Sequence, residues 1–421
     1  MKDTAPKWER RAGLPGRAWD YDALRELVRG EGLPLGVVDL DCLERNIQRV
    51  ARIASASQKT IRIATKSVRC PELTRHILDF GGKAFKGLMC YSAPEAAFLA
   101  RQGFDDLLIA YPSVQNEEFE MVFELTLAGK QVILMIDEAM HVELLTKFFK
   151  VKEVPADFSF SVCLDVDLSL RPFSGALHLG VQRSPIRSLE DFNRMVRLIL
   201  NTKHLTLSGI MGYEAQIAGV PDGNPFTPLL NPIVAWVKSQ SKKAVARRRE
   251  AISRYLDAQS VRLEIFNGGG SGSIKSTVRE PWLTEVTVGS GFLQSHIYDY
   301  FGENECEPAF CFALPVTRIP EPGMVTCQSG GFVASGAASW DKSPIPFLPE
   351  GLRALPSEGF GEVQTPLRNR SQKKLLPGDP VFFRPAKAGE IAERFNEYLL
   401  RRGNEIEARV KTYRGLGQCF Y

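Results

Sequence analysis

The stretch Ile61-Arg-Ile-Ala-Thr-Lys66 is a short apolar run that ends in a lysine. Seven further runs of similar character follow it, each separated from the next by a segment long enough to cross back over a sheet. Together they predict strands at residues 61–66, 85–91, 106–111, 131–137, 158–166, 205–213, 262–267 and 284–289. Helical periodicity between them predicts helices at residues 71–80, 94–102, 117–128, 140–149 and 189–200.

Eight strands joined by crossovers favour a closed parallel barrel over an open parallel sheet, although both architectures show the same alternation. We therefore predict an α/β fold built on a (β/α)8 TIM-like barrel. In such a barrel the chemistry lies at the C-terminal ends of the strands.

The pattern changes after residue 295 to short apolar runs separated by Pro and Gly, at residues 310–316, 324–327, 380–383 and 408–413. This predicts a second, mainly β domain. Residues 344–374 show neither strand nor helical periodicity and predict a long loop. The domains expected are a polar leader at 1–33, a barrel domain at 34–295 and a β-rich C-terminal domain at 296–421. The strand-like run at 34–41 is a candidate to pair with the second domain.

Length and composition agree with two globular domains. The chain has 421 residues, more than the roughly 250 to 300 at which a single core stops growing. Hydrophobic residues make up 44% and charged residues 24%, which excludes a disordered, collagen-like or coiled-coil chain. The net charge is only +4, so no nucleic-acid partner is expected. The densest basic run predicts one solvated helix face and contains Lys242, Lys243, Arg247, Arg248, Arg249 and Arg254.

The sequence favours a cytoplasmic location. Its eight cysteines are scattered and form no CxxC pair, which is typical of a reducing compartment. The first twenty residues are charged and lack the apolar core of a signal peptide. No stretch approaches the roughly 18 apolar residues of a membrane span, so no membrane partner is expected.

Lys66 is the first candidate for chemistry, because it ends the first predicted strand. A lysine desolvated at a barrel mouth has a lowered pKa, and its neutral amine can attack a carbonyl group. Taken alone, however, a lysine at this position is more often a solvated strand end.

A glycine-rich segment directly after the seventh strand supports the catalytic interpretation. It reads Asn267-Gly-Gly-Gly-Ser-Gly-Ser273, and Gly289-Ser290-Gly291 follows the eighth strand. Loops after the last two strands of such barrels usually bind phosphate, and glycines let backbone amides approach it. The alternative is a flexible surface loop. The predicted phosphate cup consists of Asn267, Gly268, Gly269, Gly270, Ser271, Gly289 and Ser290. A lysine facing it suits pyridoxal phosphate.

Several motifs taken together resemble the D-threonine aldolase and D-serine dehydratase family. They are Val37-Val-Asp-Leu-Asp-Cys-Leu-Glu-Arg-Asn46, Lys66 before Pro71-Glu-Leu73, Tyr91-Ser-Ala-Pro-Glu-Ala96, Asp105-Asp-Leu-Leu-Ile-Ala-Tyr-Pro112 and Gly268 to Gly270. The resemblance covers residues 34–295 well and the remainder loosely. It implies an alanine racemase-like barrel that binds pyridoxal phosphate through Lys66, and a homodimer.

Three further residues are candidates to flank the cofactor or move a proton. Arg171 closes the segment after the fifth strand and could contact the cofactor ring or phenolate; the alternative is an Asp/Arg pair that holds a loop. Tyr213 ends the sixth strand, either as a ring contact or as core filler. His178 is a titratable group in a nearby polar loop, although a lone histidine is more often structural.

The resemblance breaks down at a metal-binding element. Metal-dependent members of the family carry Pro-x-His-x-Cys or Pro-x-His-x-Asp in the second domain, whereas the matching segment here is Pro385-Ala-Lys-Ala-Gly389. Neither a lysine nor a glycine is a credible ligand. We therefore expect no divalent metal, and a role for Lys387 in replacing its positive charge.

The resulting expectation is a pyridoxal-phosphate-dependent lyase that cleaves a small β-hydroxy amino acid by a retro-aldol reaction. The base is left open between His178 and Lys387. Elimination of the D-serine dehydratase type and racemisation at Cα are alternatives, because the same cofactor supports all three. A non-catalytic pyridoxal phosphate carrier is the alternative from another class.

Overall fold

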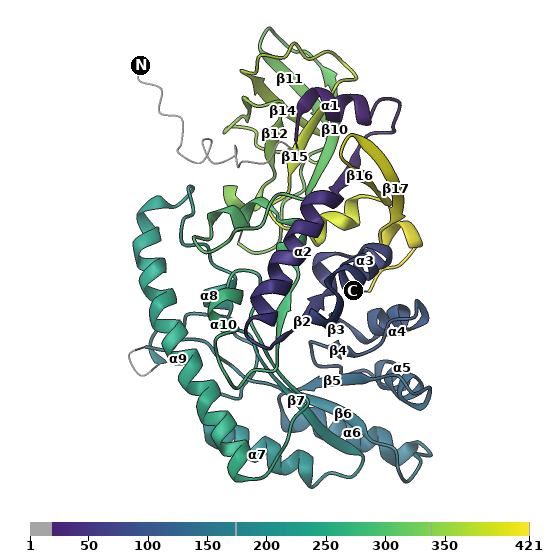
Figure 1. Ribbon diagram of the computed structural model, residues 1–421, viewed down its shortest axis with the longest axis vertical. Helices are drawn as coiled ribbons and strands as arrows, with labels where there is room; N and C mark the ends of the chain where they lie inside the picture. Colours follow the sequence, from purple (N-terminus) through teal and green to yellow (C-terminus); the bar gives the residue numbers. More distant parts are fainter. Residues whose placement is uncertain (1–18, 173–174, 338, 421) are drawn as a thin grey trace.

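The computed structural model describes residues 19–172, 175–337 and 339–420. Two β structures follow one another along the long axis of the molecule, with a barrel in the lower half and a second sheet in the upper half (Figure 1). The long helix α9 (Asn231–Ala258) runs along one side of the barrel. The domain limits at residues 33/34 and 295/296 stay predictions.

The lower half is a closed barrel of eight parallel strands, as predicted. The strands are β2 (Thr60–Ala64), β3 (Phe85–Cys90), β4 (Leu107–Ile109), β5 (Val132–Ile136), β6 (Phe160–Asp165), β7 (Leu205–Gly212), β8 (Ile265–Gly268) and β9 (Glu285–Val288). The barrel closes where β9 pairs with β2, with Ile63 opposite Val288. The first and last strands of the barrel are therefore neighbours.

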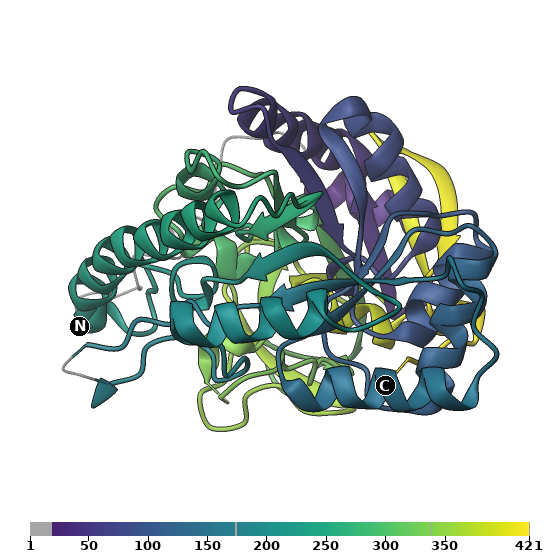
Figure 2. The ribbon, with the colours of Figure 1, turned by 90° about the horizontal axis from the view of Figure 1, so that it is seen from below.

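Helices surround the barrel on its outer side (Figure 2). They include α3 (Pro71–Gly81), α4 (Ala93–Arg101), α5 (Asn116–Leu127), α6 (Ala139–Val151) and α7 (Leu189–Leu200). Shorter helices α8 (Ala215–Ala218), α10 (Ile274–Thr277) and α11 (Ser290–Leu293) follow the last three barrel strands. The side chain of Ser92 accepts a hydrogen bond from Glu95 N and starts α4.

The barrel interior has an apolar layer and a polar layer. The apolar layer contains Leu108, Ala110, Ile133, Met135, Cys163, Met211 and Ile265. In the polar layer Arg62 is fully buried and pairs with Glu285 at 2.7 Å and Asp106 at 2.8 Å. Each of these charged groups therefore has a partner of opposite charge inside the barrel.

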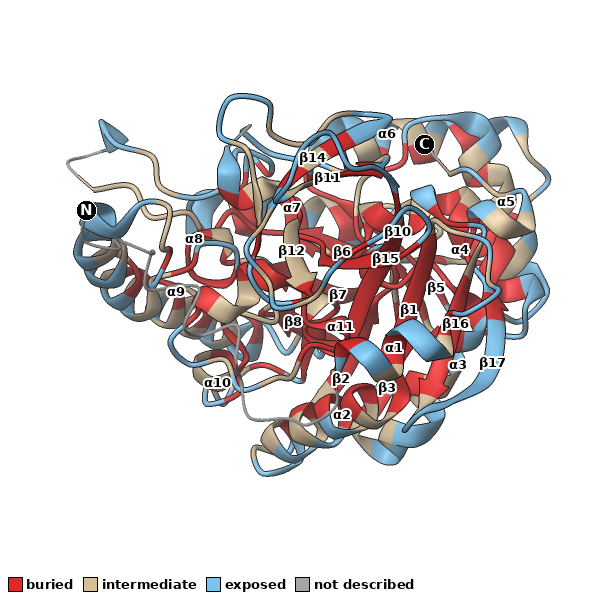
Figure 3. Ribbon diagram, turned by 90° about the horizontal axis from the view of Figure 1, so that it is seen from above, coloured by how far each residue is buried: buried red, intermediate tan, exposed pale blue. Residues whose placement is uncertain are grey.

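The upper half is a mixed sheet in the order β13-β14-β11-β10-β1-β16-β17, with β15 between β10 and β12. Its strands are β1 (Leu35–Asp39), β10 (Phe310–Arg318), β11 (Met324–Gln328), β12 (Ile345–Leu348), β13 (Leu352–Ala354), β14 (Gln364–Asn369), β15 (Pro380–Arg384), β16 (Glu397–Arg402) and β17 (Glu405–Lys411). β1 is antiparallel to β10 and parallel to β16. Figure 3 shows β1, β10 and β15 largely buried and β17 exposed.

The prediction of a long loop over residues 344–374 is wrong, because three strands, β12, β13 and β14, lie there. They are three to six residues long and only partly buried, so no alternation of apolar and polar residues develops. Pro346 and Pro366 lie within two of them. Proline within a sequence normally argues against a strand, except near the edge of a sheet.

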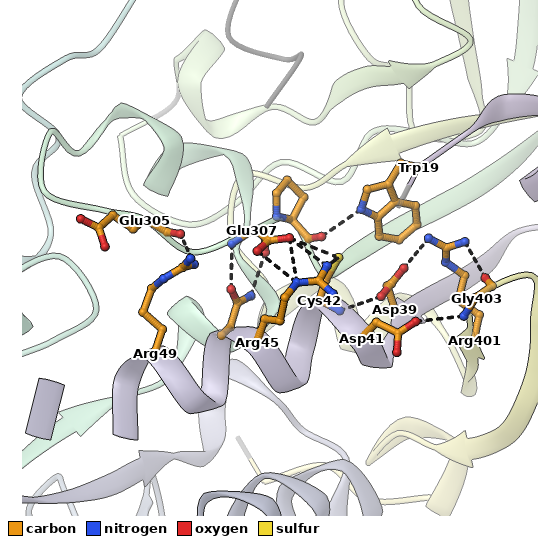
Figure 4. A network of polar contacts seen from close by, with 12 residues as sticks. Trp19, Asp39, Asp41, Cys42, Arg45, Arg49, Glu305, Glu307, Arg401 and Gly403 are labelled. Carbon is orange, nitrogen blue, oxygen red and sulfur yellow. Dashed lines mark hydrogen bonds and ion pairs between the residues drawn. The ribbon is translucent and has the colours of Figure 1, made fainter. Parts of the chain in front are cut away.

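Helix α2 (Leu40–Ser55) ties the two halves together (Figure 4). Its Arg45 forms an ion pair with Glu307 at 2.9 Å, and Asn46 donates to the Glu307 carbonyl oxygen at 2.8 Å. At the start of the helix, Asp39 accepts from Cys42 N and pairs with Arg401 of β16. These contacts, of which those of Asp39 are buried, join the second sheet to the barrel half.

Among the residues described, no helix combines the length and apolar character needed to cross a bilayer. All eight cysteines carry free thiols, and six of them are buried. The remaining α-helix, α1 (Tyr21–Leu27), packs on the second sheet through Tyr21 and Leu24.

Candidate active site

A cavity of about 780 Å³ opens where the C-terminal ends of the barrel strands face the second domain. Its volume is in the usual range for a small-molecule or cofactor site. Its lining brings together predicted site residues from segments far apart in the chain: Lys66, Tyr213, Asn267, Gly269, Gly270, Ser271, Gly289, Ser290 and Lys387.

Lys66 follows strand β2 in a single 3-10 turn (Thr65–Ser67), and its Nζ donates to the Tyr111 hydroxyl at 3.0 Å. Its side chain is exposed to the cavity, so the predicted desolvation by neighbouring apolar residues is not observed. Burial alone would raise the pKa of Tyr111, but the charges of Lys66 and Arg183 outweigh it and lower the pKa. The amine and the phenol therefore form one polar pair at the mouth.

The glycine loop forms the opposite wall of the cavity. Gly269 has φ +83°, which favours glycine, and a Cβ on Gly270 would lie 2.9 Å from the Ala218 Cβ. Ser271 Oγ accepts from Gly291 N at 2.9 Å and so joins the loops after β8 and β9. This wall is a narrow cradle of backbone and hydroxyl groups, as a phosphate site requires.

Lys66 and the cup lie at the same mouth because the barrel closes between β2 and β9. Ser67, the residue after the lysine, has its Oγ 3.2 Å from Ser290 Oγ. A Cβ on Gly289 would lie 2.7 Å from Ser67 Oγ. The lysine segment and the second half of the cup are therefore in direct contact.

A buried carboxylate, Glu214, holds the glycine loop from behind. It accepts from Gly269 N at 3.0 Å, Ser273 Oγ at 2.9 Å and Thr277 Oγ1 at 2.6 Å. Burial by itself would raise the pKa of Glu214, but the guanidinium of Arg249 and these hydrogen bonds lower it below its usual value. The conformation of the cup therefore depends on a charge that lies outside the cavity lining.

Arg249 lies on α9 and corrects the prediction of a fully solvated basic face. Its side chain is fully buried and pairs with Glu214 at 2.5 Å and Glu280 at 2.7 Å. A Cβ on Gly268 would lie 2.3 Å from Arg249 Nη2, so Gly268 faces this guanidinium rather than the cavity. Arg249, one member of the basic run, is thus a buried structural residue behind the glycine loop. Helix periodicity alone could not predict this position.

The second domain contributes Lys387 from the segment after β15. Its Nζ donates to the Ser335 carbonyl oxygen at 2.7 Å and to Ser335 Oγ at 3.1 Å. Burial lowers the pKa of Lys387, and the charge of Lys66 contributes to the same effect. A Cβ on Gly389 would lie only 1.9 Å from the Lys66 carbonyl oxygen.

A family model for the N-terminal domain of alanine racemase matches residues 38–293. The chain belongs to this family. It is 22% identical over 321 residues to 3-hydroxy-D-aspartate aldolase of Paracoccus denitrificans (strain Pd 1222), a match that covers 74% of this chain and 76% of that protein.

Two solved structures show the same fold. D-threonine aldolase from Filomicrobium marinum matches with a TM-score of 0.74 and 18% identity, over 90% of this chain and 94% of that one. D-threo-3-hydroxyaspartate dehydratase from Delftia sp. HT23 matches with a TM-score of 0.67 and 15% identity, over 92% and 98%. The predicted alanine racemase-like barrel, its second β domain and the family resemblance are confirmed.

In this alanine racemase-type barrel, Arg183 rather than Arg171 reaches the cavity. The Arg183 guanidinium lies 5.6 Å from the Tyr111 ring centroid and 6.0 Å from that of Tyr213. Arg171 lies outside the cavity lining and pairs with the buried Asp167 at 3.1 Å. The alternative considered for Arg171, an Asp/Arg pair that holds a loop, describes what the structure shows.

Two other predicted residues take different places from those expected. His178 does not line the cavity, and its Nε2 bonds to the Val181 carbonyl oxygen at 3.2 Å. Asn267 lies at the cavity floor, but its Nδ2 donates to Glu285 at 2.7 Å and Thr287 at 2.8 Å. His178 therefore lies outside the cavity lining, and the Asn267 side chain serves the polar layer of the barrel.

The residues present at the cavity do not fit a divalent metal ion. Of the two positions compared with the family's metal-binding element, Lys387 carries an amine and Gly389 has no room for any side chain. Across residues 19–172, 175–337 and 339–420, no group of three or more His, Cys, Asp and Glu side chains could hold a metal ion.

Several residues that line the cavity were not predicted as site residues from the sequence. Tyr91 is the first residue after β3 and Tyr111 the second after β4, so the rule that selected Lys66 could have found them. Arg183 lies in an irregular loop that shows no periodicity. Phe420 reaches the cavity from the end of the chain and packs on Phe98, with ring centroids 5.4 Å apart. No local pattern identifies either of these last two residues.

Proposed function

We propose that this chain is a pyridoxal-phosphate-dependent lyase that cleaves a small β-hydroxy amino acid by a retro-aldol reaction without a divalent metal ion. One observation supports the proposal above all: Lys66 and the glycine cup line the same cavity, and the residue after Lys66 contacts the cup. When bound, pyridoxal phosphate supplies an aldehyde that condenses with an amine and a ring that withdraws electrons from the carbon next to that amine.

The residues of the cavity suit this cofactor. Lys66 would hold its aldehyde carbon, and the cup of Gly269, Gly270, Ser271, Gly289 and Ser290 would hold its phosphate. The close contact at Gly270 supports this assignment. A Cβ on Gly270 would lie 2.9 Å from the Ala218 Cβ and would leave less room in the cradle. The phosphate would also be held through loops whose shape the Glu214 carboxylate maintains.

Arg183 and Tyr213 would border the cofactor ring. The Arg183 guanidinium lies over the rings of Tyr111 and Tyr213, and these two contacts help to fix its position. A fixed cation beside the ring would tune its electron withdrawal. Arg69 and Arg183 also line the cavity, where Glu390 is the acidic residue of the lining, so the lining favours an anionic substrate.

The substrate class rests on the relatives. The names of 3-hydroxy-D-aspartate aldolase and D-threonine aldolase both denote cleavage of a β-hydroxy amino acid. We infer the same class for this chain. Which side chain and which stereoisomer it accepts are the subject of the product test below.

The cofactor assignment is tested with a Lys66→Ala variant. The wild-type protein incubated with pyridoxal phosphate and dialysed should keep a visible absorbance band, because Lys66 binds the aldehyde covalently. The variant should lose that band and retain its fold by circular dichroism. Lys373→Ala, a lysine paired with Asp22 on the surface, is the matched control and should keep the band. A band of full intensity in Lys66→Ala would remove the basis of the proposal.

The reaction is tested by incubating the loaded protein with D- and L-threonine and with D- and L-3-hydroxyaspartate, each with and without a chelator. Release of glycine and an aldehyde, unchanged by the chelator, supports the proposal. Keto acid and ammonia would identify a dehydratase, and inversion without cleavage would identify a racemase. Absence of turnover with the band intact would indicate a pyridoxal phosphate carrier, and loss of cleavage with the chelator would contradict the metal-free proposal.

A further inference from the structure

The segment between β15 and the 3-10 helix at Glu390–Arg394 lies directly on the turn that carries Lys66. At Gly389 a Cβ would lie 1.9 Å from the Lys66 carbonyl oxygen, so this position must lack a side chain. Two residues earlier, Lys387 lines the same cavity as Lys66. The close approach at Gly389 is therefore what brings a second amine to the cavity.

The position of the Lys387 amine is set by Ser335 and Glu390. Lys387 Nζ donates to Ser335 O at 2.7 Å and to Ser335 Oγ at 3.1 Å. Ser335 in turn donates from its backbone nitrogen to Glu390 Oε2 at 2.6 Å and from its hydroxyl to Glu390 Oε1. A neutral amine has two hydrogens and one lone pair, so these two bonds leave the lone pair for another partner.

The charges around Lys387 act in both directions. Burial lowers the pKa of Lys387, the carboxylates of Glu390 and Asp341 raise it, and the amines of Lys342 and Lys66 lower it. The net pKa is below that of an ordinary lysine. A larger share of Lys387 is therefore neutral near neutral pH than for a solvated lysine.

We propose that Lys387 is the general base that removes the β-hydroxyl proton of the substrate. In this step the O–H bond breaks toward Lys387 Nζ, the β carbon forms its carbonyl, and the Cα–Cβ bond breaks. Its electron pair stays on the Cα fragment, which takes up a proton and leaves as glycine, while Lys387 releases its proton to solvent. This inference rests on the proposed function and assigns its unidentified base.

The other titratable groups considered for this role have different partners. The Tyr111 hydroxyl is bonded to Lys66 at 3.0 Å, and His178 does not line the cavity. Glu390 lines the cavity, but both of its carboxylate oxygens accept bonds from Ser335. Lys387 lines the cavity, and its amine, when neutral, is a stronger base than a carboxylate or a neutral phenol.

The test compares Lys387→Met and Lys387→Arg with the wild-type holoenzyme and with the surface control Lys373→Met. Cleavage of the best substrate from the product test should fall roughly 100-fold or more in both Lys387 variants, because a permanently protonated arginine cannot act as a base. The cofactor band should remain. Exchange of the glycine α-proton with D2O, followed by NMR, should stay within a few-fold of wild type, since glycine has no β-hydroxyl.

A pH profile and an amine rescue complete the test. Lys387→Ala should regain cleavage when ethylamine is added, and the gain should grow with the concentration of neutral amine. Because neutral Lys387 is the active form, kcat should rise with pH through its pKa. Glu390→Gln removes a charge that raises this pKa, so the rise should shift to lower pH.

The outcomes separate this inference from the proposed function. Wild-type cleavage rates in Lys387→Met, or equal losses of cleavage and glycine exchange, would overturn the role of Lys387 as base. Lack of both the cofactor band and glycine exchange in the wild-type protein would instead overturn the proposed function, and this inference with it. If Lys387→Arg retained cleavage, the position would need only a fixed positive charge and not a base. That result would also contradict the inference.

Discussion

The carboxyl group of Asp165, at the end of β6, is buried beneath the level at which the cavity opens to solvent. Burial raises the pKa of Asp165 to about 7, the nearby Asp137 carboxylate adds to this effect, and Arg183 opposes it. In the unfolded chain the pKa returns to the ordinary 3.8. The folded protein therefore binds this proton more tightly than the unfolded chain does.

This difference gives stability a pH dependence of known sign. Between about pH 4 and pH 7 the folded state holds more protons at Asp165, so its contribution to stability falls as the pH rises. The Asp165→Asn variant has no carboxyl group at this position and should not show that loss. The unfolding free energy of the variant minus that of the wild-type protein should therefore be about 2 kcal/mol larger at pH 8 than at pH 5. Urea denaturation at the two pH values measures the difference, with the exposed Asp157→Asn as control. A difference that does not change with pH would contradict the prediction.

The pair of Glu214 and Arg249 illustrates how one residue can matter without touching a ligand. Both side chains are almost fully buried, and each compensates the charge of the other. Breaking such a pair on one side typically costs about 3–5 kcal/mol, because a buried charge is left alone. The loop that would bind phosphate thus depends on an arginine from helix α9.

The segment from β15 to Gly389 is the structural element that joins the second domain to the lysine turn. Gly389→Ala would place a Cβ against the Lys66 carbonyl oxygen. We expect a loss of about 1–3 kcal/mol in unfolding free energy and weaker retention of the cofactor band, because the lysine turn must move. Gly32→Ala is the matched control, since its Cβ would meet no atom within 4 Å. Equal stability of the two variants would show that the contact is easily relieved.

Elements differed in how well their sequences predicted them. The barrel strands were predictable because parallel strands buried on both faces are continuous apolar runs. Strands β12, β13 and β14 were not, because they are short, partly exposed and interrupted by proline. Helix α9 was recognised as basic, yet its buried Arg249 depends on Glu214, a partner between β7 and α8 that helical spacing does not reveal.

At the outer surface, large apolar side chains gather where α9 begins. Leu229 is 89% exposed, Ile233 and Trp236 are each 60% exposed, and Leu230 is also exposed. Exposed apolar groups clustered in this way commonly mark an interaction surface. We propose that they contact a second copy of this chain, in a homodimer related by a two-fold axis.

The dimer is tested by light scattering after size exclusion. The wild-type protein should have the mass of two chains, and Ile233→Glu/Trp236→Glu should have the mass of one, because two charges would be buried at the contact. Val151→Glu replaces an equally exposed apolar residue on α6 and should leave the mass unchanged. A monomeric wild-type protein, or a dimeric double variant, would contradict this proposal.

The amino-acid sequence was enough to predict the barrel, the lysine and the glycine loop, because each depends on a local pattern. A strand end or a glycine run can be recognised from a few neighbouring residues alone. The closure of eight parallel strands then places the first strand beside the last. Arg183, Arg249 and Phe420 take their places through an irregular loop, a buried ion pair and a chain end. Such contacts join segments far apart in the chain and leave no periodicity, so they are seen only after the chain has folded.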